Sequence, residues 1–119
     1  MGKGTTGAEG FRNTQGGRGN VTNTTLENIL RDTTPGRPTM GRTTQHIRRG
    51  GFNQANTDFN NLNPSNVTGF STANGTGRTG VLPDGRTVTV RSYSSDGRPT
   101  LEIRNANNRR RIEIRYDEE

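Results

Sequence analysis

Three short segments toward the C-terminal end of the chain alternate strictly between polar and apolar residues. They are Thr87–Arg91, Thr100–Arg104 and Arg111–Tyr116. Successive side chains of a β-strand point to opposite faces of its sheet, so the alternation predicts three strands that share one apolar face and one polar face. Turn motifs, Pro-Asp-Gly at 83–85 and Ser-Asp-Gly-Arg at 95–98, precede the first two strands and predict antiparallel hairpin connections.

The segments before these strands have helical and short-strand patterns. A short helix is predicted around Leu26, Ile29 and Leu30, with Thr24 as its N-cap and Glu27 completing a capping box. An apolar stripe predicts a second helix over 51–62, residues 33–43 read as a loop, and 67–70 and 80–82 are candidate short strands. Helices followed by strands indicate an α+β fold, with one or two N-terminal helices packed on a four- to five-stranded antiparallel β-meander.

Apolar residues are scarce, and this limits the size of the core. Only 23% of the 119 residues are hydrophobic, and residues 1–20 are rich in Gly, Thr and Asn. This composition predicts a flexible linker over 1–20 and a single domain over 21–119. No signal peptide is visible after Met1, so export would require a longer parent protein. No apolar run approaches transmembrane length, so a membrane partner is not expected.

The charge of the chain favours a nucleic-acid partner. The formal net charge is +6, and Lys3 is the only lysine among 17 basic residues. Guanidinium groups bind phosphate oxygens bidentately and stack on bases, whereas ammonium groups act as hydrated point charges. A polyanion such as RNA is therefore the expected partner.

The polar face of the predicted sheet carries the residue types that phosphoryl chemistry needs. It comprises Thr87, Thr89, Arg91, Glu102, Arg104, Arg111, Glu113 and Arg115. We expect Glu102 or His46 to act as general base, and Arg91, Arg104 and Arg115 to stabilise charge on the phosphate. The alternative interpretation is that Glu102 and Glu113 only form cross-strand ion pairs with the arginines.

His46 is the only histidine and lies in a basic segment, with Arg42, Arg48 and Arg49 nearby. Neighbouring positive charges would lower its pKa, which suits a base at neutral pH. Further substrate contacts are expected from Arg48, Arg49, Thr87, Thr89, Ser94, Ser95, Asp96, Arg98 and Tyr116. Two of these have structural alternatives, because the Asp96-Gly97 pair can simply shape a turn and Tyr116 can cap the core.

Several metal-dependent chemistries lack their ligands in this sequence. One histidine and no cysteine cannot form an HNH or His-Cys zinc site. The order Pro83-Asp84 followed by Glu102-Ile103-Arg104 only weakly matches a PD…(D/E)xK nuclease, since the lysine is missing. We therefore expect no metal and no cofactor, and favour RNA, whose 2′-OH supplies an internal nucleophile. The alternatives are a DNase with a divalent ion bound by Asp84, Asp96 or Glu102, and a non-catalytic basic binding module.

Four sequence blocks resemble a bacterial toxin module. They are GFNQANTDFNNLNP at 51–64, GRTGVLPDGRTVTVR at 77–91, SSDGRPTLEIR at 94–104 and RIEIRY at 111–116. Over about residues 41–116 the chain is similar to the C-terminal domains of polymorphic toxins carried on Rhs, contact-dependent inhibition and LXG proteins. The resemblance implies a ribonuclease of the barnase–EndoU–colicin–RelE (BECR) type that cleaves tRNA or rRNA and leaves a 2′,3′-cyclic phosphate. It also implies a cognate acidic immunity protein, and secretion within a larger effector that acts in the target-cell cytoplasm.

Overall fold

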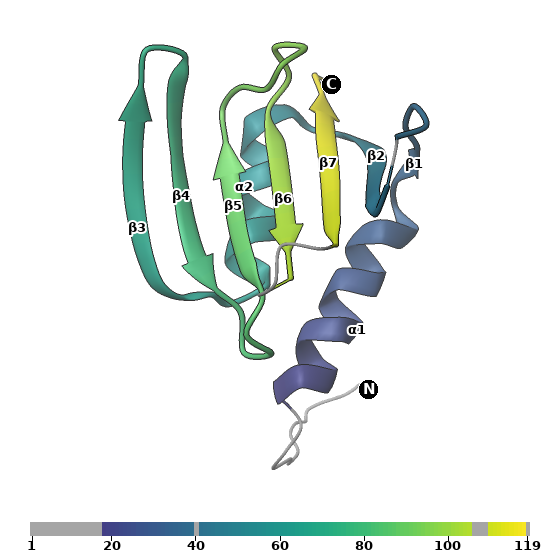
Figure 1. The fold of residues 1–119 in the computed structure, drawn as a ribbon, viewed down its shortest axis with the longest axis vertical. Coiled ribbons are helices and arrows are strands. Elements are labelled where there is room, and N and C mark those ends of the chain that lie inside the picture. The colour runs from purple at the N-terminus through teal and green to yellow at the C-terminus, as the bar shows by residue number, and fades with distance from the viewer. Residues whose placement is uncertain (1–17, 40, 106–109, 119) are drawn as a thin grey trace.

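The computed structural model describes residues 18–39, 41–105 and 110–118, with side chains from residue 24 onward. Two helices and seven strands follow one another along the chain (Figure 1). In order they are α1 (Arg18–Arg31), β1 (Thr34–Pro35), β2 (Thr43–Arg49), α2 (Gly51–Asn61), β3 (Ser65–Thr72), β4 (Gly75–Val81), β5 (Thr87–Arg91), β6 (Thr100–Arg104) and β7 (Arg111–Asp117).

All seven strands belong to one mixed sheet. Its order is β1-β2-β7-β6-β5-β4-β3, and β2 pairs with β7 in parallel while the other pairs are antiparallel. After β2 the chain passes through α2 to the far edge at β3, then returns strand by strand until β7 lies beside β2 (Figure 1). The predicted four- to five-stranded antiparallel meander is therefore wrong. It describes β3 to β7 only, and it omits β1 and the parallel strand β2.

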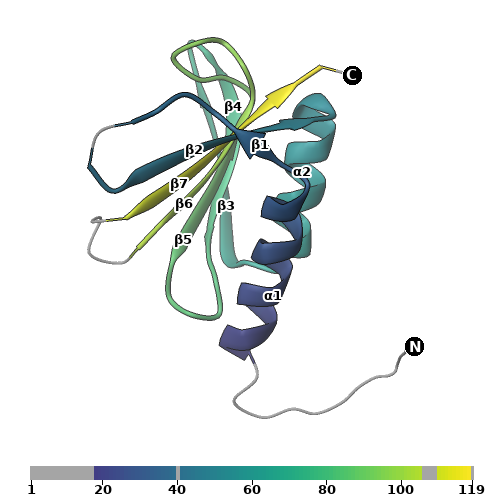
Figure 2. The ribbon, with the colours of Figure 1, turned by 90° about the vertical axis from the view of Figure 1, so that its right-hand side faces the viewer.

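The two faces predicted for β5, β6 and β7 are confirmed by the register of these strands. Val88 is paired with Ile103, which is paired with Ile112, and the next such row is Val90, Leu101 and Ile114. Both helices lie on this apolar side of the sheet (Figure 2). The core consists of Leu26, Ile29, Ala55, Phe59, Leu62, Leu82, Val88, Val90, Leu101, Ile103, Ile114 and Tyr116.

The predicted element boundaries agree best where the periodicity is strongest. The helix expected over 51–62 is α2, and the expected strands at 87–91 and 100–104 coincide with β5 and β6. Helix α1 starts at Arg18, so Thr24 lies inside the helix and is not its N-cap. The loop expected at 33–43 contains β1 and the first residue of β2. Residues 1–17 of the expected linker lie outside the described residues.

The predicted hairpin turn before β5 is present. Gly85 has a φ of +92°, which favours glycine, and the Leu82 amide donates to the Arg86 carbonyl at 2.7 Å. Asp84 accepts a hydrogen bond from the Arg86 amide, so its carboxylate stabilises this turn. Within the described part of the chain, neither helix has the length and apolar character needed to cross a bilayer.

Candidate active site on the uncovered sheet face

The side of the sheet opposite the helices, called here the open face, carries a cluster of charged residues. In register across β5, β6 and β7 lie a row of Thr89, Glu102 and Glu113 and a row of Thr87, Arg104 and Arg111. Arg91 and Arg115 flank Thr100 in the third row. Four arginines and two glutamates leave this part of the open face with a net charge of +2, as binding of a polyanion requires.

A pocket of about 400 Å³ opens on the β3-to-β6 part of this face. Its volume is in the range of small-molecule sites. The end of the pocket near β3 and β4 carries aromatic and hydroxyl groups, and the end near β6 carries charged groups. The lining residues are Phe70, Thr79, Thr87, Thr89, Arg91, Tyr93, Glu102 and Arg104.

Glu102 is the central acidic group of the pocket. Its side chain is only 7% exposed, and three guanidinium groups surround its carboxylate. Arg104 Nη2 and Arg111 Nε each lie 3.2 Å from Glu102 Oε2, and Arg91 Nη1 lies 3.7 Å from Oε1. A carboxylate that is nearly buried needs such compensation, because isolated buried charge is strongly unfavourable.

The arginines around Glu102 have unused hydrogen-bonding capacity. Arg91 Nε is buried and has no hydrogen-bond partner among the described residues. The Nε atom is too buried to reach a ligand, but the 3.7 Å contact of Nη1 with Glu102 is longer than a hydrogen bond and the side chain is 24% exposed, so its outer nitrogens can donate to an anion in the pocket. Arg91 also lies over the Tyr93 ring, with its guanidinium carbon 5.9 Å from the ring centroid. The charged end of the pocket is therefore suited to a phosphate group.

Arg115 lies on the open face but outside this pocket. Its side chain is 7% exposed, and it contacts Glu113 at 3.4 Å and Asp96 at 3.3 Å. Its Nε and Nη1 atoms have no hydrogen-bond partner in the described residues, since the Nη1–Asp96 contact lacks hydrogen-bond geometry. Arg115 contacts the β5–β6 loop through Asp96, and its role as a phosphate ligand stays a prediction.

The β5–β6 loop forms a compact network of its own. Asp96 accepts hydrogen bonds from the Arg98 guanidinium, the Ser94 hydroxyl and the Arg98 amide, and these bonds hold the pKa of its carboxyl well below the usual range. Arg98 also pairs with Asp117 at 2.9 Å. Ser95 is exposed in the same loop. These bonds favour the structural alternative for Asp96, that of shaping the turn.

Comparison with known proteins does not test the family prediction. No family model, curated protein or solved structure matches this chain. The function therefore has to be argued from the side chains of the open face.

The structure does not bring His46 together with Glu102. His46 is paired with Ile114 in the parallel β2–β7 ladder, so its side chain lies on the helix side of the sheet. Its Nδ1 atom is 3.4 Å from the Thr33 hydroxyl and its Nε2 atom is 3.1 Å from the Thr44 hydroxyl. His46 and Glu102, the two residues predicted as alternative general bases, thus lie on opposite faces of the sheet and do not share a site. The pKa of His46 is lowered as expected, but burial lowers it, not the neighbouring arginines.

If the chain cleaves RNA as the sequence predicts, the His46→Gln variant should keep the rate within about threefold of the native value, because loss of a general base would cost about 10²-fold or more. A rate assay on the same RNA checks this, and a loss of about 100-fold would show that His46 takes part in catalysis.

The His46→Gln variant should also alter the pH dependence of stability. Unfolding raises the depressed pKa of His46, so below about pH 6.5 the unfolded chain binds a proton more readily and stability falls. His46→Gln removes that contribution.

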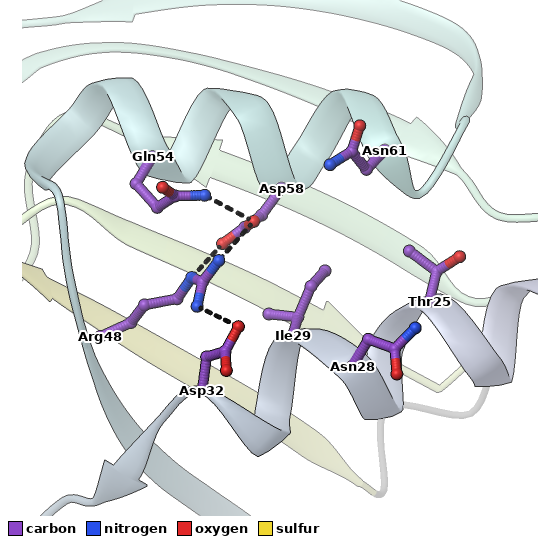
Figure 3. Close-up of a pocket in the computed structure, with 8 residues that line it drawn as sticks. All are labelled: Thr25, Asn28, Ile29, Asp32, Arg48, Gln54, Asp58 and Asn61. Carbon is purple, nitrogen blue, oxygen red and sulfur yellow. Dashed lines mark hydrogen bonds and ion pairs between the residues drawn. The ribbon is translucent and has the colours of Figure 1, made fainter.

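Arg48 and Tyr116, both predicted substrate contacts, lie on the helix side of the sheet and apart from the open face, where Arg48 lines a second pocket of about 420 Å³. Figure 3 shows the Arg48 guanidinium between Asp58 of α2 and Asp32 after α1. The Arg48 Nε–Asp58 Oδ2 distance is 2.8 Å, and the fully buried Tyr116 hydroxyl donates to the same carboxylate oxygen at 2.8 Å. Burial and the adjacent carboxylate raise the pKa of Tyr116 well above its ordinary value. These residues anchor the helices to the sheet.

The other predicted substrate contacts remain on or beside the open face. Thr87 and Thr89 line the pocket, and the exposed Arg49 lies at the end of β2 beside Asp117. Sequence reasoning missed four residues near Glu102: Phe70, Thr79, Tyr93 and Arg111, the last of which was placed on the face but not in the site. The alternation of Thr68, Phe70 and Thr72 was the available signal for Phe70.

The carboxylates named for a divalent ion are not arranged around one position. Asp84 lies in the turn before β5 and Asp96 in the loop after it, so the whole strand separates them. Asp84 is paired with Arg86, and Asp96 is paired with Arg98. Metal sites for phosphoryl transfer need several oxygen ligands within about 2.0–2.6 Å of one ion. This geometry gives the metal-dependent DNase alternative no support.

Proposed function

We propose that this chain is a metal-independent endoribonuclease whose active site is the open-face pocket. One observation carries the proposal: the Glu102 carboxylate lies in the pocket among Arg91, Arg104 and Arg111, with 3.2–3.7 Å between the charged atoms. A carboxylate base and arginines beside it are the groups that 2′-OH transesterification requires. Both helices lie on the other side of the sheet (Figure 2), so neither covers the open face that carries the pocket.

In the proposed reaction, the substrate phosphate takes over guanidinium hydrogen bonds that Glu102 receives in the free protein. Glu102 then accepts the proton of the ribose 2′-OH. The 2′ oxygen forms a bond to phosphorus, and the bond from phosphorus to the 5′ oxygen breaks. The 5′ oxygen leaves with a proton from water, and the other product carries a 2′,3′-cyclic phosphate. Arg91 and Arg104 stabilise the charge that develops on the phosphate oxygens.

The choice of RNA follows from the residues that surround the pocket. Glu102 provides a base and the arginines provide positive charge, and these groups suffice when the substrate carries its own nucleophile next to the phosphate. RNA carries that nucleophile as its 2′-OH, and DNA does not. The proposed substrate class is tRNA or rRNA, as the toxin resemblance implies.

The same resemblance supports a biological setting for this activity. We propose that the domain is delivered by a larger secreted effector into a target-cell cytoplasm, and that an acidic immunity protein neutralises it. The basic open face is the surface that an acidic inhibitor fits best, by charge complementarity. The support consists of the four sequence blocks and this charge.

The proposal is tested by incubating the protein with purified tRNA, rRNA and plasmid DNA in EDTA. We expect both RNAs, or one of them, to be cut and the plasmid to remain intact, because the reaction uses the 2′-OH and no metal. Addition of Mg²⁺ should not raise the RNA cleavage rate by more than about threefold, since a metal that supplied catalysis would contribute several kcal/mol. Cutting of the plasmid only when Mg²⁺ is present would contradict the proposal.

A further inference from the structure

The β3–β4 end of the pocket is built differently from its charged end. Phe70 lies in the middle of β3 and is paired with Gly77 on β4. Its ring occupies the space above Gly77, because a Cβ atom at that position would lie 2.4 Å from Phe70 Cζ. Gly77 thus lets an aromatic ring lie close against the sheet, where the other residues of the pocket surround it.

Two threonines that line the same pocket as Phe70 leave a free acceptor. Thr79 Oγ1 donates to the Val88 carbonyl at 3.2 Å, which uses its single proton. The 3.0 Å contact between Thr79 Oγ1 and Thr89 Oγ1 must then be a donation from Thr89. The Thr89 oxygen keeps its lone pairs, and it lines the pocket. It can therefore accept a hydrogen bond from a ligand N–H group.

These features have the chemistry of a nucleobase site. An aromatic ring offers a stacking surface that every base can use, and a hydroxyl acceptor can bind a base N–H group. Thr89 is paired with Glu102 across the β5–β6 ladder, so the proposed base contact and the carboxylate lie side by side. A base that contacts Thr89 is therefore one strand away from Glu102.

We infer that Phe70 and Thr89 form the subsite for the nucleobase whose ribose is attacked. The base stacks on the Phe70 ring and donates an N–H to Thr89 Oγ1, which places its 2′-OH at Glu102. Phe70 is a positioning residue in this arrangement. The inference rests on the proposed ribonuclease function, and it adds that one unpaired nucleotide is bound by its base.

The chain contains no tryptophan, so a Phe70→Trp variant has a single reporter inside the proposed subsite. The probes are a 2′-O-methyl RNA hexamer, which lacks the nucleophile, and an abasic hexamer with the same number of phosphates. We expect the RNA hexamer to quench the tryptophan emission and the abasic hexamer to leave it unchanged. Binding of both probes is followed independently by the anisotropy of a terminal dye.

Val67→Trp is the matched control, since Val67 lies on the same strand, is 46% exposed and does not line the pocket. Its emission should not respond to either hexamer. An unchanged Phe70→Trp emission while anisotropy reports binding would overturn the subsite, and so would equal responses of the two variants. Absence of any binding would overturn it as well.

Activity measurements separate this inference from the proposed function. We expect Phe70→Ala to raise KM by about tenfold or more and to change kcat less, because stacking contributes mainly to binding. Native protein that does not cut RNA, while Phe70→Trp is still quenched, would overturn the ribonuclease proposal alone. Native cleavage with an unresponsive Phe70→Trp and an unchanged KM in Phe70→Ala would overturn the subsite alone.

Discussion

Replacing Glu102 with glutamine is expected to lower the RNA cleavage rate by about 10²- to 10⁴-fold, the usual contribution of a general base. The amide has the shape of the carboxylate but cannot take up the 2′-OH proton. RNA binding should be retained or become tighter, because three guanidinium groups lose the negative charge that they surround. Single-turnover cleavage and a filter-binding titration on the same RNA measure the two effects.

Glu113→Gln is the control for this substitution. Glu113 lies next to Glu102 in register and also pairs with two arginines, Arg111 and Arg115 at 3.4 Å each, but it does not line the pocket. It should change the cleavage rate by less than about tenfold, below the contribution of a general base, because its carboxylate lies outside the pocket. Equal losses in the two variants would mean that the acidic groups act only through the ion-pair network. If the native protein binds RNA but does not cleave it, the result would support the alternative of a non-catalytic basic binding module.

Asp58→Ala is expected to lower the free energy of unfolding by about 3–5 kcal/mol, the cost of leaving a buried charge partner unpaired. The Asp58 carboxylate is 1% exposed and accepts bonds from Arg48 of β2, Gln54 of α2 and Tyr116 of β7. Its removal leaves the Arg48 guanidinium and the Tyr116 hydroxyl without that acceptor. For a domain of this size, each kcal/mol lowers Tm by about 4–8 °C, so a fall of more than about 10 °C is expected.

Tyr116→Phe is the milder comparison, because it removes one hydrogen bond to Asp58 and keeps the aromatic ring in the core. It should cost about 1–2 kcal/mol. Thermal unfolding of the native protein and both variants measures the order of these effects. A Tm of Asp58→Ala within about 2 °C of the native value, equivalent to less than about 0.5 kcal/mol, would show that this network does not hold the helices to the sheet.

The open face was predictable from sequence because its strands follow a simple rule. In β5, β6 and β7 every second residue is Val, Leu, Ile or Tyr, so the polar positions between them had to share the other face. Strand β2 breaks the rule. Its helix-side positions are Thr44, His46 and Arg48, and hydrogen bonds and an ion pair, not apolar packing, satisfy the last two. No periodicity therefore indicated a strand there.

The parallel pairing of β2 with β7 joins segments far apart in the chain, so local patterns carried no signal for it. This pairing determines the face of the sheet on which His46 lies. Because His46 lies level with Ile114, it faces the helices together with Arg48, whereas Arg49 lies on the side of the open face. The pocket also could not be predicted without the fold, because its lining combines Phe70 of β3 with Glu102 of β6, and two strands lie between them.

The central claim, that Glu102 on the open face activates the 2′-OH of bound RNA, is tested most directly by the chemistry of the products. The measurement is mass spectrometry of the fragments formed in EDTA from one RNA and from the same RNA with a single 2′-deoxy nucleotide at the cleaved position. We predict 2′,3′-cyclic phosphate and 5′-hydroxyl ends from the all-ribose RNA, and no cut at that position in the substituted one. Cleavage of both RNAs at the same rate, or 5′-phosphate ends, would contradict the account.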